Sequence, residues 1–183
     1  MSALLDPGTP LATYYAQTRP RIGEVLSRRS LGTLDAVMIG RYAMTIGAAD
    51  PSHYDSEAAR PAGYADVVAP PNMLAAIAEW GIGTPEAVLG PDGTPHDGDM
   101  PLGDGELGLR VMGAGEEMEL VNPFTAGTEL VLETTLEAVT PKQTRSGPCI
   151  FVTTLNTFAA KDGTVLNRNR RTVALRNPVQ ESS

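Results

Sequence analysis

The sequence contains little of the chemistry that metal centres, disulfide scaffolds and covalent nucleophiles require. Cys149 is its only cysteine, and His53 and His96 are its only histidines. A lone cysteine excludes a disulfide within the chain, and the apolar run after Cys149 indicates a buried, unreactive thiol. These three residues have no metal-ligand spacing, and no Ser, His and Asp pattern for covalent catalysis is evident. We therefore expect no bound metal and no resident cofactor.

Positive charge and long apolar runs are also scarce. The 183 residues include 22 acidic and 14 basic side chains, which give a net charge of −8. This balance argues against non-specific binding to nucleic acid, which needs clustered Lys and Arg. No apolar run reaches about 18 residues, so no membrane span is predicted, and residues 1–21 lack the pattern of a secretory signal. The expectation is a cytoplasmic protein with no nucleic-acid and no membrane partner.

Hydrophobic periodicity predicts helices in the first half of the chain. Prolines within residues 1–20, an N-terminal extension, leave room for at most a short helical turn. An extended segment or first strand is expected after Arg21. Apolar residues then recur at helical spacing over residues 34–46, with Thr33 as a candidate N-cap. Residues 72–81 are apolar on nearly every side, which predicts a buried central helix.

The last third of the chain alternates apolar and polar residues as β-strands do. A strand is expected around residues 118–124, and Lys161-Asp162-Gly163 has the composition of a hairpin turn. Three long strands are predicted, at residues 128–139, 148–160 and 164–177. Helices early and strands late, with no βαβ rhythm, predict one α+β domain over residues 1–183. Its curved antiparallel sheet would cover the central helix, and residues 83–106 would form a long loop rich in Gly, Pro and Asp.

The most specific pattern lies in residues 47–55, which read Gly-Ala-Ala-Asp-Pro-Ser-His-Tyr-Asp, followed by Val-Ala-Pro-Pro-Asn-Met at residues 68–73. Together with residues 113–127 and 144–163, these segments resemble the MaoC-like N-terminal dehydratase family. That family includes (R)-specific enoyl-CoA hydratases and (R)-3-hydroxyacyl dehydratases. Its signature reads Gly-Asp-x-Asn-Pro-x-His, and Gly47, Pro51 and His53 match it. The resemblance covers nearly the whole chain.

The resemblance implies a hot-dog fold and an acyl thioester substrate carried on coenzyme A or phosphopantetheine. It also implies a homodimer or a heterodimer with a second hot-dog subunit. In active relatives an Asp and a His add or remove water across a 2,3-enoyl thioester. A backbone N–H at the start of the central helix stabilises the developing enolate oxygen there.

The catalytic residues that the resemblance implies are incomplete in this chain. His53 falls on the catalytic histidine, but Ala48 stands at the position of the aspartate. Asp50 and Asp55 are the candidates for a displaced carboxylate, although a loop cap is the commoner fate of such residues.

The helix-start donor is also altered, because Pro71 stands where active relatives have glycine and proline has no N–H. A donor would have to come from Asn72 or from Met73. Pro71, Asn72 and Met73 are therefore the predicted substrate-binding residues.

These departures favour a substrate-binding or half-catalytic subunit of an enoyl-CoA hydratase or (R)-3-hydroxyacyl thioester dehydratase. Open alternatives are a self-sufficient homo-oligomeric dehydratase that uses His53 with Asp50 or Asp55, a non-catalytic acyl-thioester-binding module, and a thioesterase. Two basic clusters have two interpretations, as solvated strand faces or as contacts with the phosphates of the carrier. They are Arg28 with Arg29, and Arg168 with Arg170 and Arg171.

Overall fold

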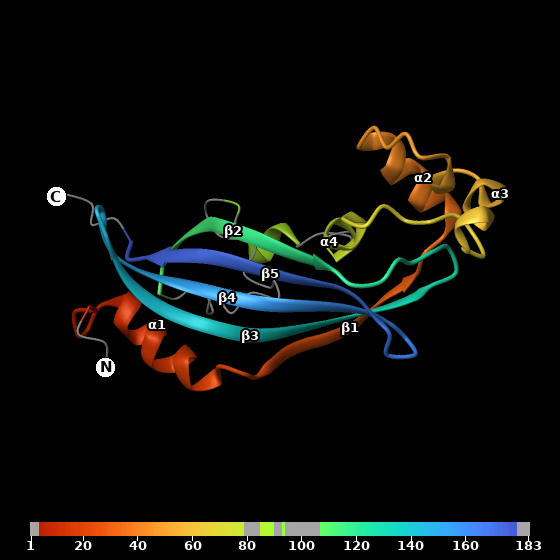
Figure 1. Cartoon of the computed structure of the whole chain (residues 1–183). Coiled ribbons are helices and arrows are strands. Elements are labelled where there is room, and N and C mark those ends of the chain that lie inside the picture. Colours follow the sequence, from red (N-terminus) through yellow and green to blue (C-terminus); the bar gives the residue numbers. More distant parts are fainter. Residues whose placement is uncertain (1–3, 79–84, 90–92, 94–106, 179–183) are drawn as a thin grey trace.

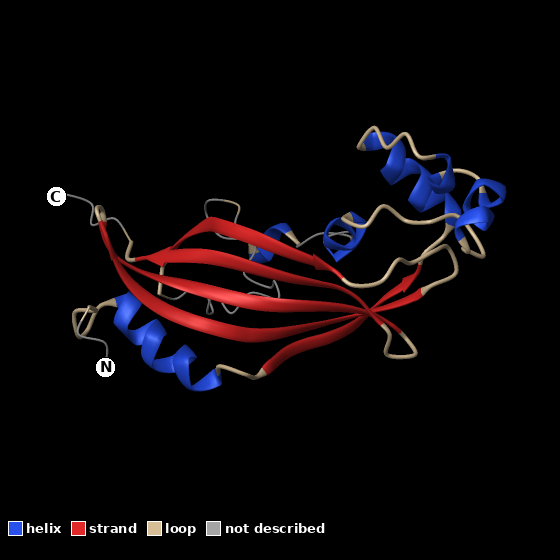
Figure 2. Cartoon of the chain, in the orientation of Figure 1, coloured by secondary structure: helices blue, strands red, loops and turns tan. Residues whose placement is uncertain are grey.

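The fold is a five-stranded antiparallel sheet with short helices, and the computed structural model describes residues 4–78, 85–89, 93 and 107–178 (Figures 1 and 2). The helices are α1 (Pro10–Thr18), α2 (Ala36–Thr45), α3 (Ser56–Ala59) and α4 (Met73–Ala78). The strands are β1 (Val25–Thr33), β2 (Arg110–Leu120), β3 (Glu129–Thr144), β4 (Gly147–Ala160) and β5 (Val165–Arg176). The strand order is β1-β3-β4-β5-β2, which confirms the predicted α+β class and antiparallel sheet.

Alternation of buried and half-buried side chains is clearest in the first half of β3, because successive side chains of a strand point to opposite faces. In β3, Leu130, Leu132, Thr134 and Leu136 are buried, while the side chains between them are half-buried. The predicted hairpin between β4 and β5 is confirmed. Its Asp162 carboxylate accepts the Thr164 N–H at 2.9 Å, and Gly163 takes the positive φ of 92° that the turn needs.

The central helix packs on the inner face of this sheet. Met73, Leu74 and Ile77 of α4 are buried in one cluster with Leu132 and Phe158 of the strands. Two side chains of the sheet also bind the helix backbone: the Arg29 guanidinium donates to the Ala78 carbonyl at 2.8 Å, and the Asn167 amide donates to the Pro71 carbonyl at 2.6 Å. The predicted buried helix is thus confirmed over its described part, whereas residues 79–81, with Trp80, lie outside the described residues.

The expectation of at most one helical turn in residues 1–20 was wrong. Helix α1 has nine residues, and Leu11 and Tyr14 are buried in a second cluster with Leu136 of β3. Pro10 occupies the first helical position, where a missing N–H costs nothing, and the Thr9 hydroxyl caps the helix by accepting the Ala12 N–H at 3.3 Å. The prolines therefore mark the ends of this helix.

A smaller correction concerns the predicted helix at residues 34–46. Helix α2 begins two residues later, and its N-cap is Asp35, whose carboxylate accepts the Met38 N–H at 2.8 Å. Thr33 is instead the last residue of β1, because its backbone pairs with Glu129. Figure 1 shows α2 and α3 beyond the end of the sheet that lies opposite to the two chain termini.

Strand β2 is longer than the strand that the sequence predicts, since it begins at Arg110 and ends at Leu120. A register shift between Gly113 and Gly115 marks an irregularity that glycine accommodates. Most of the predicted loop at residues 83–106, with His96, lies outside the described residues. Within the described ranges, no helix has both the length and the apolarity that crossing a membrane requires.

We expect alkaline pH to destabilise the fold through Tyr14. Burial raises the pKa of its phenol to about 12, against the smaller opposing effects of a hydrogen bond with Thr18 and the charge of Arg21. Unfolding would return this pKa to about 10 and release a proton. Stability should therefore be unaffected below about pH 10 and should fall between about pH 10 and 12. Denaturant unfolding of wild type and Tyr14→Phe across this range checks the expectation, and equal slopes with pH would contradict it.

Candidate functional site

The loop after α2 folds into two short capped turns. Asp50 caps the 3-10 turn η2 (Pro51–His53), and its carboxylate accepts the Ser52 N–H at 2.9 Å. Asp55 caps α3 in the same way, accepting the Glu57 N–H at 2.9 Å. Both candidate carboxylates thus have a local structural partner.

The electrostatics of Asp50 make it a weak proton acceptor. Hydrogen bonds with the backbone N–H and the side chain of Ser52 hold the pKa of the Asp50 carboxyl below its ordinary value. A general base works best when its pKa lies near the operating pH. The pKa of Asp50 is instead lowered, which moves it further from neutral pH.

One hydrogen bond fixes the orientation of His53. Its Nδ1 lies 2.6 Å from the Val68 carbonyl oxygen, which can only accept, so Nδ1 carries a proton. Nε2 of the neutral ring is then an acceptor. Val68 is itself held in place, because its N–H donates to Ser52 O at 2.9 Å and it bridges to Thr125. The imidazole is therefore oriented with a basic nitrogen opposite the Val68 bond.

Ala48 offers no ionisable group, and its backbone is occupied. Its N–H donates to Ala43 O at 2.9 Å, and its carbonyl accepts the Tyr54 hydroxyl at 2.6 Å. These two bonds fix the path of the chain between α2 and η2.

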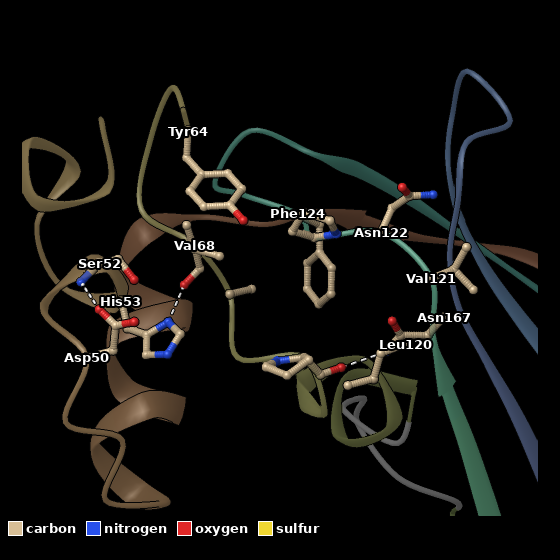
Figure 3. A pocket seen from close by; sticks show the side chains of 13 residues that line it. Asp50, Ser52, His53, Tyr64, Val68, Leu120, Val121, Asn122, Phe124 and Asn167 are labelled. Carbon is tan, nitrogen blue, oxygen red and sulfur yellow. Dashed lines mark hydrogen bonds between the residues drawn. The ribbon is translucent and has the colours of Figure 1, made fainter. Parts of the chain in front are cut away.

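A pocket of about 300 Å³ lies beside this loop (Figure 3). It brings together the predicted residues His53, Asp50 and Pro71, whereas Ala48, Asp55, Asn72 and Met73 do not line it. Most of its wall is apolar. The lining residues are Asp50, Ser52, His53, Tyr64, Val68, Ala69, Pro71, Leu120, Val121, Asn122, Pro123, Phe124 and Asn167.

The start of α4 presents few backbone donors. Met73 is completely buried, and its N–H donates to Pro70 O at 3.0 Å. Pro71 has no N–H, and its carbonyl is bound by Asn167. The Asn72 N–H is therefore the remaining donor candidate of the predicted substrate-binding residues.

Sequence reasoning missed the far wall of the pocket. The sequence did not predict Tyr64, Asn122, Phe124 or Asn167 as site residues, although Asn122 and Phe124 lie in a segment that resembles the family. Asn167 gave no usable signal in the sequence, because its inward position on β5 follows from its pairing with Phe158 in the folded sheet.

The basic clusters make ion pairs along the sheet. Arg168 lies 3.2 Å from the Glu119 carboxylate, Arg170 lies 2.9 Å from that of Glu137, and all of these side chains are partly exposed. The interpretation as a solvated strand face fits this arrangement. In the described part of the chain, no group of three or more His, Cys, Asp or Glu could hold a metal ion.

A comparison with known protein families identifies the family to which this chain belongs. The model of the family "FAS1-like, dehydratase domain region" matches residues 22–168, which include the loop, the pocket and most of the sheet. The chain belongs to this family. It is therefore related to dehydratases and hydratases.

Individual relatives agree with this assignment. The chain is 28% identical, over 165 residues, to a probable enoyl-CoA hydratase alpha subunit of Thermomonospora curvata. The match covers 86% of this chain and 50% of that protein, so the chain spans about half the length of this relative.

Solved structures confirm the predicted hot-dog fold of this dehydratase-family chain. The ChsH1-ChsH2 complex of Mycobacterium tuberculosis is similar, with a TM-score of 0.69, 22% identity and 94% of each chain covered. The MaoC-like dehydratase of Rhodospirillum rubrum has a TM-score of 0.57 and 27% identity, and the match covers 86% of this chain and 94% of that one.

Proposed function

We propose that this chain is the acyl-thioester-binding subunit of a heteromeric hydro-lyase that interconverts a 2-enoyl thioester and its 3-hydroxyacyl form. One observation carries the proposal: the pocket contains an oriented histidine but no carboxylate suited to act as its partner. Ala48 stands at the signature position, and the Asp50 carboxylate is a turn cap whose pKa is lowered. A second hot-dog subunit would supply the complete Asp and His pair.

The chemistry explains why one group is insufficient. Adding water across a conjugated thioester needs a group that activates water and a group that moves a proton to the α-carbon. Nε2 of His53 can accept one hydrogen bond from a bound water or substrate, because Nδ1 is committed to Val68. In this proposal His53 contributes to binding, and the proton transfers take place on the partner.

An acyl thioester fits the pocket's surfaces. Val68, Leu120 and Phe124 provide apolar wall for an acyl or pantetheine segment, while His53 and Asn167 provide polar groups at separate points. Coenzyme A or phosphopantetheine would be the carrier of the substrate and is not a resident cofactor. The dehydratase family supports this substrate class, and the alpha-subunit name of the T. curvata relative supports a heteromer.

The sheet offers an edge where such a partner can dock. β2 is an edge strand, and its Met112 and Leu120 side chains are 52% and 55% exposed. An exposed edge with large apolar side chains favours pairing with another sheet. We place the partner subunit along β2 in this proposal.

A self-sufficient homo-oligomer is the second candidate, and one observation favours it. Asp50 and His53 line the same pocket, so a water between them would lie near both groups. The lowered pKa of Asp50 weighs against it, because the carboxylate would be a poor base at neutral pH.

Restoring the missing groups tests the proposal in this chain. Ala48→Asp alone should give little turnover of a 2-enoyl-CoA, because Pro71 still cannot donate to the enolate oxygen. Ala48→Asp with Pro71→Gly should turn over faster by roughly 10²-fold, the usual value of one such donor. Loss of the conjugated thioester absorbance measures the rate.

Ala49→Asp with Pro71→Gly is the matched control, since it adds the same charge one residue beyond the signature position. This control should remain inactive. Equal activity of the two double variants, or an inactive Ala48→Asp, Pro71→Gly protein that folds and binds acyl-CoA, would count against the assignment of this site.

A further inference from the structure

Asn167 is a buried polar side chain that lines the same pocket as His53. It lies on β5 and pairs with Phe158, so it points to the inner face of the sheet, and it is only 1% exposed. Its Nδ2 donates to the Pro71 carbonyl at 2.6 Å and lies 3.9 Å from the sulfur of Met118. One end of this amide therefore holds the start of α4.

The bond to Pro71 also determines which end of the Asn167 amide is nitrogen and which is oxygen. The Pro71 carbonyl is an acceptor, so it requires the nitrogen of Asn167, and Oδ1 must lie on the other side. Figure 3 shows that oxygen on the side of the pocket, facing away from the bond to Pro71. Among the described residues, no group donates to Oδ1.

A buried amide oxygen without a donor costs free energy, and native structures contain few such groups. In a pocket, a ligand donor can supply the missing hydrogen bond. The thioester group has no N–H or O–H. The two donors of an acyl-pantetheine ligand near its reacting end are a pantetheine amide N–H and the 3-hydroxyl of the acyl chain.

We infer that Asn167 Oδ1 accepts a hydrogen bond from an N–H or O–H group of the ligand in this pocket. The inference rests on the proposed function, because it takes an acyl thioester as the ligand. Asn167 is thus a substrate-recognition residue that joins the ligand to the start of the central helix.

Asn169 supplies a matched control. It lies two residues along β5, is 2% exposed, and also has an Oδ1 without a donor among the described residues. Its Nδ2 donates to the Glu116 carboxylate. Asn169 does not line the pocket, so its replacement alters a similar buried amide without touching the ligand.

The test measures the binding of butyryl-CoA and 3-hydroxybutyryl-CoA to the 183-residue chain by calorimetry. Asn167→Leu should weaken binding by about tenfold, the usual value of one such hydrogen bond, and Asn169→Leu should leave it within about twofold. A loss confined to 3-hydroxybutyryl-CoA identifies the hydroxyl as the donor. An equal loss for both ligands identifies a pantetheine amide.

Ligand analogues give a second measurement that does not depend on the folding of variants. If a pantetheine amide is the donor, wild-type protein should bind butyryl-CoA with N-methylated pantetheine amides about tenfold more weakly than butyryl-CoA. If the 3-hydroxyl is the donor, it should bind 3-methoxybutyryl-CoA about tenfold more weakly than 3-hydroxybutyryl-CoA. The analogue should bring no further loss in Asn167→Leu. Wild-type affinity unchanged by both analogues would overturn the inference alone, whereas wild type that binds neither parent thioester would overturn the proposed function with it.

Discussion

Replacing Phe158 with alanine is expected to lower the free energy of unfolding by about 3–5 kcal/mol, the usual cost of deleting a buried aromatic side chain. Phe158 is 1% exposed and belongs to the cluster that joins β3 and β4 to helix α4. The cavity would open in the cluster that also contains Met73 and Leu74, so the packing of the central helix should loosen as well. Denaturant unfolding with a common slope for wild type and variant measures the change.

Phe151→Ala is the control for this prediction. Phe151 lies on the same strand but on the opposite face, where it is half-buried beneath the Lys142 ammonium, which lies 5.6 Å from the ring centroid. This substitution should cost about 1 kcal/mol, as expected where little cavity forms. Equal losses for the two phenylalanines would contradict the assignment of the inner face.

Strand β3 could be predicted from the sequence because the burial of its first half follows a period of two. The spacing of Leu130, Leu132 and Leu136 predicts which face of β3 is buried. The irregular elements were harder. The first half of β2 was not predicted, because Gly113 and Gly115 interrupt the strand pattern where the pairing shifts register. Helix α1 was not predicted, because Pro10 was interpreted as a helix breaker although proline also occurs at the first position of helices.

The candidate site was predictable only in part. The signature motif led to His53, and the second motif led to Pro71, which lines the same pocket. The roles of Asp50 and Asp55 depended on which backbone N–H each carboxylate meets, and that is a property of the folded loop. Asn167 was missed because a polar residue within an alternating strand resembles an outward-facing position.

In the proposed function, this chain binds an acyl thioester but does not complete the hydration by itself. The purified chain should therefore show no turnover of a 2-enoyl thioester above a small background rate. A site that lacks a general acid or base loses about 10²–10⁴-fold in rate. His53→Ala should consequently weaken binding of the thioester but leave the small background rate at saturating thioester unchanged.

Binding and turnover of a short 2-enoyl-CoA should be measured together on the purified 183-residue chain, free of any second hot-dog protein. We expect saturable binding by all three proteins, weaker in His53→Ala because His53 contributes a hydrogen bond to the ligand. At saturating thioester, wild type, His53→Ala and Asp50→Asn should show the same background rate. Substantial hydration by the chain alone, abolished by His53→Ala and by Asp50→Asn, would contradict this expectation and identify a self-sufficient dehydratase.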